Sequence, residues 1–400
     1  MVGAADCCDH CGGRHIDRSL SQHNLRIAVL KERAVGETRV AIIPETVKKF
    51  AALGANIAIE IGAGAAASIS DQAYVDAGAE VSTAAKAAAG ADIILAVQAP
   101  DVKLLKGAAP GAWVAASFDP FGQNDRIEAY AKGGFEALSM EFMPRITRAQ
   151  SMDILSSQSN LAGYKAVLAA ADQYGRAFPM MMTAAGTITA ARAFIMGVGV
   201  AGLQAIATAR RLGAQVSATD VRSATKEQIQ SLGAKPIFVE NVAGIEGEGS
   251  GGYATEMSEE YQKAQAELVS SHIAKQDIVI TTALIPGRAA PRLISDAQIA
   301  TMKPGSVIFD LAVAQGGNVE GSVPDQVVER HGVKIMGFSN TPAHLPADAS
   351  ALFARNLYNF LSAFWDAETG KPVLDEEIGD AVRLTQGGKV INERLLGSGE

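Results

Sequence analysis

The sequence predicts an α/β fold made of two doubly wound, Rossmann-like domains with a cleft between them. The chain has 400 residues, well beyond the size at which one hydrophobic core stops growing, which favours two domains. Short apolar segments alternate with helical ones in both halves, as in βαβ units whose parallel strands are covered on both faces. We therefore expect residues 1–24 to form a disordered extension, residues 25–160 with 345–400 the first domain, and residues 161–344 the second.

The first half contains a regular series of strands and helices. A strand at 26–30 precedes a helix at 44–53 and a second strand at 56–61. An Ala-rich helix near 84–89 and strands at 93–97, 113–117 and 135–139 continue the series. This order of elements predicts a doubly wound sheet.

The second half repeats the alternation of strands and helices after a linking segment. Residues 151–168 are polar with few charges and are predicted as a helix that joins the domains. Strands follow at 192–196, 215–219, 277–281 and 306–311, with a helix at 201–212. Residues 241–270 begin with clustered glycines and continue with charged residues, which is typical of a mobile loop that leads into a helix.

The C-terminal part contains a strongly helical stretch at 349–365. Its apolar residues recur at helical spacing, at Leu352, Phe353, Leu357, Phe360, Leu361 and Phe364. We expect this helix to pack back on the first domain; the alternative is a helix of the second domain.

Composition and charge exclude several classes of function. The net charge of −8 argues against a nucleic-acid-binding protein, because that affinity depends on clusters of Lys and Arg. The longest uncharged apolar run, at 193–209, is shorter than the roughly 20 residues that a membrane-spanning helix needs. Residues 1–24 lack the apolar segment of a secretory signal. We therefore expect a cytoplasmic protein.

All three cysteines lie near the N-terminus, at Cys7, Cys8 and Cys11, with His10 and His15 close by. A structural zinc site usually needs a second pair of ligands on a folded hairpin or helix, and the chain has no second cysteine pair. We interpret this stretch as an extension with reduced thiols and predict no metal site, with zinc binding as the alternative.

The sharpest local signal is a glycine cluster, Gly197, Gly199 and Gly202, which follows the strand at 192–196 and opens a helix. The first glycine permits a tight turn, the second lets the backbone approach a pyrophosphate, and the third lets helix and strand pack closely. From Val200 onward the helix supplies N–H groups and the positive end of its dipole. The cluster predicts a dinucleotide site; a purely structural turn is the alternative.

An acidic residue follows the next strand, as a dinucleotide site requires. Asp220 lies at the distance along the chain where a carboxylate meets the adenosine ribose hydroxyls. Because a carboxylate repels a 2′-phosphate, Asp220 favours NAD(H) over NADP(H), and the adjoining Val221 is a further candidate cofactor contact. Arg222 leaves open the alternative that a 2′-phosphate is bound here.

A long segment at 143–164 reads Met-Pro-Arg-Ile-Thr-Arg-Ala-Gln-Ser-Met-Asp-Ile-Leu-Ser-Ser-Gln-Ser-Asn-Leu-Ala-Gly-Tyr. It closely resembles the signature of the NAD(H)-binding component, the soluble part of the alpha subunit, of proton-translocating NAD(P) transhydrogenase, within the alanine dehydrogenase/transhydrogenase superfamily. Further resemblances lie at 31–33, 36–41, 178–186, 281–287 and 310–313. Together these motifs extend from residue 26 to residue 364.

The resemblance implies roles for particular residues. Arg145, Gln150 and Asp153 are implied to arrange the nicotinamide ring and its ribose, with Ser156 close behind. Such roles suit hydride transfer, which needs no protein nucleophile but needs donor and acceptor held in place. The alternative for Arg145 and Asp153 is a structural ion pair at the domain joint. The remaining implied nucleotide contacts are Gly252, Tyr253, Gln265 and Leu284. Gly252 and Tyr253 would lie on a mobile loop that closes over the nucleotide; the alternative is an ordinary surface loop.

The resemblance also implies an activity and an assembly. Hydride would pass between NADH on this chain and NADP+ on a partner subunit, coupled to proton movement across the membrane. The implied partners are an NADP(H)-binding component and a membrane-spanning subunit, and the implied state is a homodimer. Through these partners the chain would lie on the cytoplasmic side of the inner membrane.

Alanine dehydrogenase is the nearest rival, because it resembles the same span. In that family a Lys and a His bind pyruvate and move protons, and an Asp follows a strand end. Here Gln98 stands at the Lys position, residues 115–120 offer no His, and Ala314 stands where the Asp is expected. Oxidative deamination needs a group that exchanges a proton near neutral pH, so these absences disfavour it. Arg39 is left as an anion ligand or a structural partner, and a non-catalytic NAD(H) sensor is the remaining alternative.

Overall fold

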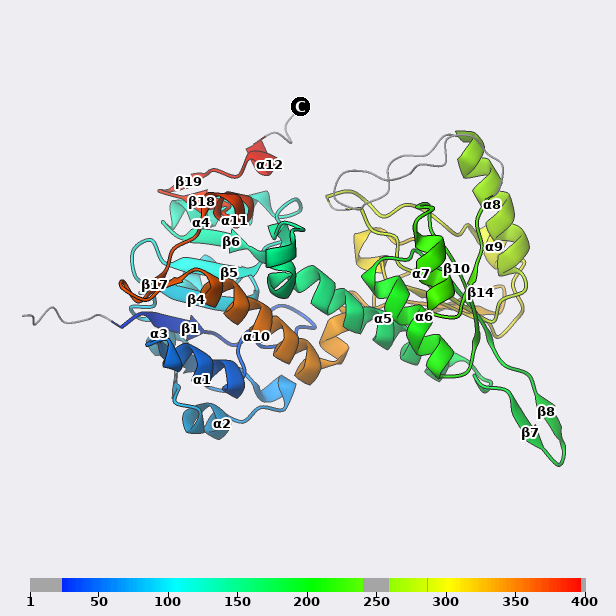
Figure 1. Ribbon diagram of the computed structural model, residues 1–400, viewed down its shortest axis with the longest axis horizontal. Helices are drawn as coiled ribbons and strands as arrows, with labels where there is room; N and C mark the ends of the chain where they lie inside the picture. The colour runs from blue at the N-terminus through cyan, green and yellow to red at the C-terminus, as the bar shows by residue number, and fades with distance from the viewer. Residues whose placement is uncertain (1–23, 240–258, 286, 397–400) are drawn as a thin grey trace, which may run out of the picture.

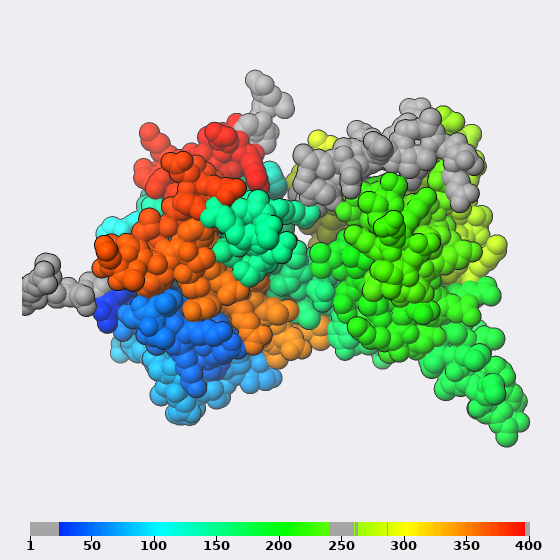
Figure 2. Space-filling model, in the orientation of Figure 1, coloured from blue at the N-terminus to red at the C-terminus, as the bar shows by residue number. Residues whose placement is uncertain are grey.

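The computed structural model describes residues 24–239, 259–285 and 287–396. It has two lobes joined by a narrower waist (Figure 2), and each lobe contains one large sheet (Figure 1). The expected α/β fold with two doubly wound, Rossmann-like sheets is confirmed. The exact domain boundaries stay a prediction.

The first sheet is entirely parallel and has the order β3-β2-β1-β4-β5-β6. Apart from the edge strand β3, its strands are largely buried, which explains their runs of Ile, Val and Ala. The strands are β1 Arg26–Val29, β2 Asn56–Glu60, β3 Glu80–Ser82, β4 Ile93–Gln98, β5 Trp113–Ser117 and β6 Glu136–Ser139. The helices that follow them are α1 Pro44–Ala52, α2 Asp71–Asp76, α3 Ala84–Ala88 and α4 Asn124–Lys132.

The second sheet has the order β11-β10-β9-β12-β13-β15-β14, with only β14 antiparallel. The strands are β9 Arg192–Met196, β10 Gln215–Thr219, β11 Lys235–Pro236, β12 Ile278–Thr281, β13 Val307–Asp310, β14 Val327–Arg330 and β15 Val333–Met336. The helices of this lobe are α6 Val200–Arg211, α7 Thr225–Ser231, α8 Glu259–Ile273 and α9 Asp296–Ile299. In both sheets the chain reverses its winding direction beside the first strand, β1 or β9, where doubly wound folds bind their ligands.

A long helix, α5 Ile154–Gln173, joins the two lobes (Figure 1). It begins later than the expected helix at 151–168, because Thr147–Met152 form a 3₁₀ helix and Asp153 caps α5 by accepting from the backbone N–H of Ser156. Gly163 lets α5 approach α6 closely, since a Cβ there would collide with the carbonyl oxygen of Ala201.

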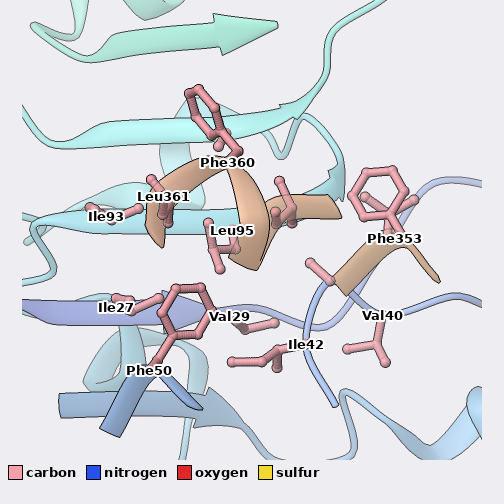
Figure 3. Close-up of a cluster of buried hydrophobic side chains, with 14 of the residues drawn as sticks. Ile27, Val29, Val40, Ile42, Phe50, Ile93, Leu95, Phe353, Phe360 and Leu361 are labelled. Carbon is pink, nitrogen blue, oxygen red and sulfur yellow. The ribbon is translucent and has the colours of Figure 1, made fainter. Parts of the chain in front are cut away.

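The C-terminal chain returns to the first lobe, as expected. Helix α10 Pro346–Ala363 places Phe353, Phe360 and Leu361 in one buried cluster with Val29 and Leu95 (Figure 3). Residues after α10 complete the lobe with α11 Glu376–Val382, α12 Glu393–Leu396 and two small hairpins, β16 Trp365–Asp366 with β17 Lys371–Pro372 and β18 Thr385–Gln386 with β19 Lys389–Val390.

An outlying hairpin is among the elements that were not predicted from the sequence. The hairpin of β7 Met181–Thr183 and β8 Gly186–Ile188 projects away from the second lobe (Figure 1). All of its strand residues are exposed, and Met180 and Met182 expose 62% and 78% of their surface. A hairpin without a core face has no alternating apolar pattern by which to recognise it.

The loops at the carboxyl ends of the two sheets contact each other. The Thr38 hydroxyl donates to the carbonyl oxygen of Ala343, and the Asn340 amide donates to Glu37 at 3.0 Å. Across the same boundary, the Phe121 ring lies 3.0 Å from where a Cβ on Gly287 would stand. Among the helices in the described ranges, none is long and apolar enough to cross a membrane.

Candidate functional site

The glycine cluster follows β9 at the point where the second sheet reverses direction. Gly197 has φ of +98°, which L side chains rarely adopt, and its backbone lies against Thr282 after β12. The Thr282 hydroxyl donates to the carbonyl oxygen of Gly197 at 3.1 Å. A Cβ on Gly202 would collide with that same carbonyl oxygen, whereas a Cβ on Gly199 would meet nothing within 4 Å. Gly197 and Gly202 therefore make the turn tight, and Gly199 faces open space.

Helix α6 presents a free N-terminus to that open space. The N-cap residue of α6 is Gly199, so no side chain caps this helix end. The first hydrogen bond of the helix runs from the Leu203 N–H to the Gly199 carbonyl oxygen. The N–H groups of the first turn therefore have no acceptor within the helix. Val200, at the start of α6, is exposed. An uncapped, accessible helix N-terminus beside an unobstructed glycine fits a pyrophosphate group.

The Asp220 carboxylate lies at the end of β10 and is already hydrogen-bonded. It accepts from the backbone N–H of Val198 at 2.7 Å and from that of Arg222 at 2.9 Å. The Arg222 guanidinium also donates to both carboxylate oxygens, at 2.9 and 3.0 Å. Because Asp220 is only 8% exposed, a ribose can reach it only if the Arg222 side chain shares the carboxylate or moves aside. Val221, between them, is half-buried.

The loop after β12 lies beside the glycine cluster, where Thr282 contacts Gly197. Leu284 is exposed there, as a nucleotide contact must be. The fully buried Asn318 holds the loop, because its amide accepts from the Ala283 N–H and donates to the Ala283 carbonyl, at 3.1 and 2.9 Å. No local pattern in the sequence marks Asn318, since its partners lie 27 to 35 residues away.

The second group of predicted residues lies at the start of α5. Asp153 and Ser156 are brought together, since the Ser156 N–H and hydroxyl donate to the two Asp153 oxygens at 2.9 and 2.6 Å. Arg145 and Gln150 precede them and are exposed. The cap of α5 explains the local geometry, because an Asp at this position accepts from the first turn of the helix.

Helix α5 sets the distance between the two groups. Gly163 touches α6 at Ala201, beside the glycine cluster, and lies ten residues beyond Asp153. At 1.5 Å per residue the Asp153 end is roughly 15 Å along the helix from that contact. The two groups thus lie apart rather than in one cluster: one is at the N-terminus of α5, and the other is beside the point where the middle of α5 touches α6.

Of the remaining predicted contacts, Gln265 lies within the described residues. Gly252 and Tyr253 lie outside the described residues. Gln265 is half-buried on α8, one turn before Val269, which packs with Ile273 against the second sheet. The N-terminal cysteines also lie outside the described residues.

A buried polar cluster occupies the corresponding edge of the first sheet. Arg39 pairs with Glu37 at 2.7 Å, and both side chains are almost fully buried. The Gln98 amide donates to the same Glu37 oxygen at 3.2 Å, and Arg39 also donates to Gln158 at 2.9 Å. Burial would raise the pKa of Glu37, but the hydrogen bonds and charge of Arg39 outweigh it and hold the pKa below its usual value. Arg39 therefore has a structural partner.

Glu32 lies at the same edge of the first sheet, and its pKa is shifted in the opposite direction to that of Glu37. Its carboxylate accepts from the backbone N–H groups of Val97 and Gln98, at 2.6 and 3.2 Å. Burial nevertheless raises the pKa of Glu32 from 4.5 to about 7. Ala314, where the rival family has an Asp, is exposed on a short 3₁₀ helix.

Comparison with known proteins agrees with this architecture. The family models that match are the alanine dehydrogenase/PNT N-terminal domain at residues 28–162 and the alanine dehydrogenase/PNT C-terminal domain at residues 166–393. The chain is 52% identical to the first part of NAD(P) transhydrogenase subunit alpha of Rhodospirillum rubrum, over 94% of this chain and 100% of that protein. The transhydrogenase structure from Sinorhizobium meliloti matches with a TM-score of 0.84 and 52% identity, over 92% of this chain and all of that one.

The rival is more distant. Alanine dehydrogenase 1 of Staphylococcus aureus is 26% identical, over 93% of this chain and 96% of that protein. Gln98 and Ala314 agree with this lower similarity, because they stand where alanine dehydrogenases are expected to have a Lys and an Asp. The chain therefore belongs to the alanine dehydrogenase/PNT family and, within it, to the NAD(P) transhydrogenase alpha subunits.

Proposed function

We propose that this chain binds NAD(H) and exchanges hydride between NADH and NADP+ held on a partner subunit, in an assembly that couples the exchange to proton movement across a membrane. One observation carries the proposal. Helix α5 joins an open, uncapped α6 N-terminus to the Asp153–Ser156 pair, so a single rigid element sets the span of an extended dinucleotide.

The chain's residues would divide the work of binding and orientation. The first turn of α6 binds the pyrophosphate, with Gly199 giving access and Asp220 recognising the ribose. Arg145, Gln150 and Asp153, with Ser156, hold the nicotinamide end by hydrogen bonds, and Leu284 covers the opposite side. Bound NADH supplies the hydride, so the chain contributes position rather than a nucleophile or base. Gly252, Tyr253 and Gln265 would complete the enclosure.

The assembly follows from the family. The named relatives are alpha subunits, so partners that bind NADP(H) and span the membrane would attach this chain to the cytoplasmic side of the inner membrane. The projecting hairpin supports a homodimer, because Met180 and Met182 expose apolar surface that a second copy could cover.

The test uses isotope transfer, because NADH and NADPH absorb alike. NADH carrying deuterium at the transferred position is mixed with NADP+, the purified full chain and the NADP(H)-binding component, and the NADPH is analysed by mass spectrometry. Deuterium in NADPH that depends on both proteins is the expected result. An Asp153→Asn variant, which keeps the cap acceptor but loses the charge, should bind NADH and transfer more slowly.

Two results would overturn the proposal. Tight NADH binding without transfer would favour the sensor. Formation of NADH from NAD+ and L-alanine by the chain alone would favour the alanine dehydrogenase alternative.

A further inference from the structure

One buried amide on the C-terminal helix holds the segment that carries Gln150, Asp153 and Ser156. Asn356 of α10 is 7% exposed and donates from its Nδ2 to the carbonyl oxygen of Ser151 at 2.8 Å. Its Oδ1 accepts from the Ser157 hydroxyl at 2.7 Å. The two bonds fall on either side of the Asp153 cap.

The segment before Asp153 needs such support because a 3₁₀ helix has poor internal hydrogen bonding. Ala149 and Met152 anchor it in the core of the first lobe, and both are at most 4% exposed. Between them, Gln150 points away from the core and is exposed. The Ser151 carbonyl oxygen is therefore a polar group through which α10 holds the backbone beside Gln150; besides Asn356, it also accepts from the Nδ2 of Asn359, on α10, at 3.1 Å.

The amide is also part of a longer network. The Gln158 Nε2 donates to the Ser157 hydroxyl at 3.3 Å and to the Ala349 carbonyl at 3.2 Å, and its Oε1 accepts from Arg39. Asn356 thus connects the first turn of α5 to the buried Arg39–Glu37 pair. Both polar ends of its side chain are used, which leaves one rotamer for Asn356.

We propose that Asn356 is a positioning residue for hydride transfer, which fixes the backbone at Ser151 and the first turn of α5 so that Gln150, Asp153 and Ser156 hold the nicotinamide in register with its acceptor. The proposal rests on the function proposed above. A displacement of about 1 Å can cost a transfer reaction roughly 100-fold in rate, while binding made mostly through the pyrophosphate and adenosine ribose is unaffected.

The first experiment compares Asn356→Ala with a matched control on the same helix. Ser350 is fully buried on α10, and its hydroxyl accepts from the Val40 N–H, far from Ser151. Ser350→Ala therefore removes the bond that joins α10 to Val40, together with the bond from the same hydroxyl to the Pro346 carbonyl oxygen at 2.6 Å. NADH affinity is measured by fluorescence, and the rate of deuteride transfer to the NADP(H)-binding component by rapid quench.

The expected result is a split between binding and transfer. Asn356→Ala should bind NADH within about twofold of the parent but transfer hydride roughly 10- to 100-fold more slowly. Ser350→Ala should transfer hydride at the parent's rate, although its thermal unfolding midpoint should fall by about as much as that of Asn356→Ala. Equal rates for the two variants would refute a positioning role.

The second experiment uses Asn356→Asp, which keeps the acceptor for Ser157 but cannot donate to Ser151 while ionised. Protonation restores an O–H donor of similar shape. The ratio of variant to parent transfer rate should therefore rise as the pH is lowered from about 8 to about 5, since burial beside a carbonyl raises the pKa of the new carboxyl. A ratio independent of pH would contradict the proposal, because loss of packing alone does not depend on that proton.

Hydrogen–deuterium exchange separates this proposal from the function on which it rests. Exchange of the amides at 147–157 should be faster in Asn356→Ala and unchanged in Ser350→Ala. If the parent itself transfers no hydride, the proposed function fails. If the parent transfers hydride but exchange at 147–157 does not change in Asn356→Ala, the positioning role fails alone.

Discussion

Asp220, the residue proposed to recognise the ribose, forms an ion pair with Arg222. Asp220 accepts from Val198 and from Arg222, and the guanidinium of Arg222 covers both carboxylate oxygens. The carboxylate therefore keeps Arg222 engaged beside the ribose position, as well as repelling a 2′-phosphate itself. Specificity at this site is a property of the pair.

Substitution of Asp220 should weaken NADH binding and improve NADPH binding at the same time. Loss of one or two ribose bonds to a charged group should cost Asp220→Ala ~1–3 kcal/mol in NADH affinity. The change also removes the negative charge that repels a 2′-phosphate beside the Arg222 guanidinium. Fluorescence titration with both nucleotides checks this, and Asp220→Asn, which still accepts from Val198, is the control for a collapsed turn. An unchanged NADH affinity would mean that the ribose lies elsewhere.

Glu32 should make stability depend on pH. Because its folded pKa is raised from 4.5 to about 7, the carboxyl contributes stability that is fully present below about pH 4.5 and is lost as the pH rises through about 7. Glu32→Gln cannot ionise and keeps one acceptor for the Val97 N–H. The difference in denaturation midpoint, parent minus variant, should therefore fall across this window and level off above it. A difference that is constant with pH would contradict the raised pKa.

At the scale of single residues, the sequence predicted those whose proposed roles depend on neighbours along the chain. Gly197, Gly199, Gly202 and Asp220 follow from a turn between one strand and one helix. The residues that were missed, Asn318 and Asn356, are buried amides whose partners lie far along the chain. A lone Asn has no sequence signal that separates such a role from a surface position.

At the scale of elements, α5 determines the geometry of the candidate site. Its first turn carries Asp153 and Ser156, and its middle touches α6 through Gly163. The sequence predicted the helix but placed its start at Ser151, because the cap at Asp153 and the preceding 3₁₀ helix were not distinguished from helix proper. The contact at Gly163 depends on how two helices cross, which no local pattern encodes.

Gly163→Ala should separate the two helices. In an isolated helix this change is favourable by about 1 kcal/mol, but here the added Cβ collides with the Ala201 carbonyl, and overpacking costs ~1–3 kcal/mol. The α6 N-terminus should shift, with a lower melting temperature and weaker NADH binding. Gly175→Ala, which meets nothing within 4 Å and has no positive φ, is the matched control and should behave as the parent. A Gly163→Ala protein as stable as this control would show that α5 and α6 can move apart without loss of stability.

At the scale of the whole molecule, the two sheets were predicted and the outlying hairpin was not. The strand order follows from alternating apolar strands and helices, because βαβ crossovers permit few arrangements. The hairpin of β7 and β8 contributes nothing to either core, so a prediction based on burial within one chain misses it.

The hairpin should govern the oligomeric state. Met182→Asp places a charge on its most exposed apolar residue, which should convert a dimer to a monomer in light scattering after size exclusion, since burial of an unpaired charge is costly. Val75→Asp is the matched control, because Val75 is an exposed apolar residue of α2, 48% accessible, outside the hairpin. A Met182→Asp protein that remains dimeric would place the interface elsewhere.

The return of α10 to the first lobe also affects how the chain is made. Phe353, Phe360 and Leu361 complete a cluster that includes Ile27 and Val29 (Figure 3), so β1 waits for α10, which follows the whole second sheet along the chain. The strands of the second sheet are all present by Met336 and need no such delay. On a ribosome, where domains tend to fold as they appear, the strands of the second lobe can therefore assemble before the core of the first lobe is complete, because that core needs α10.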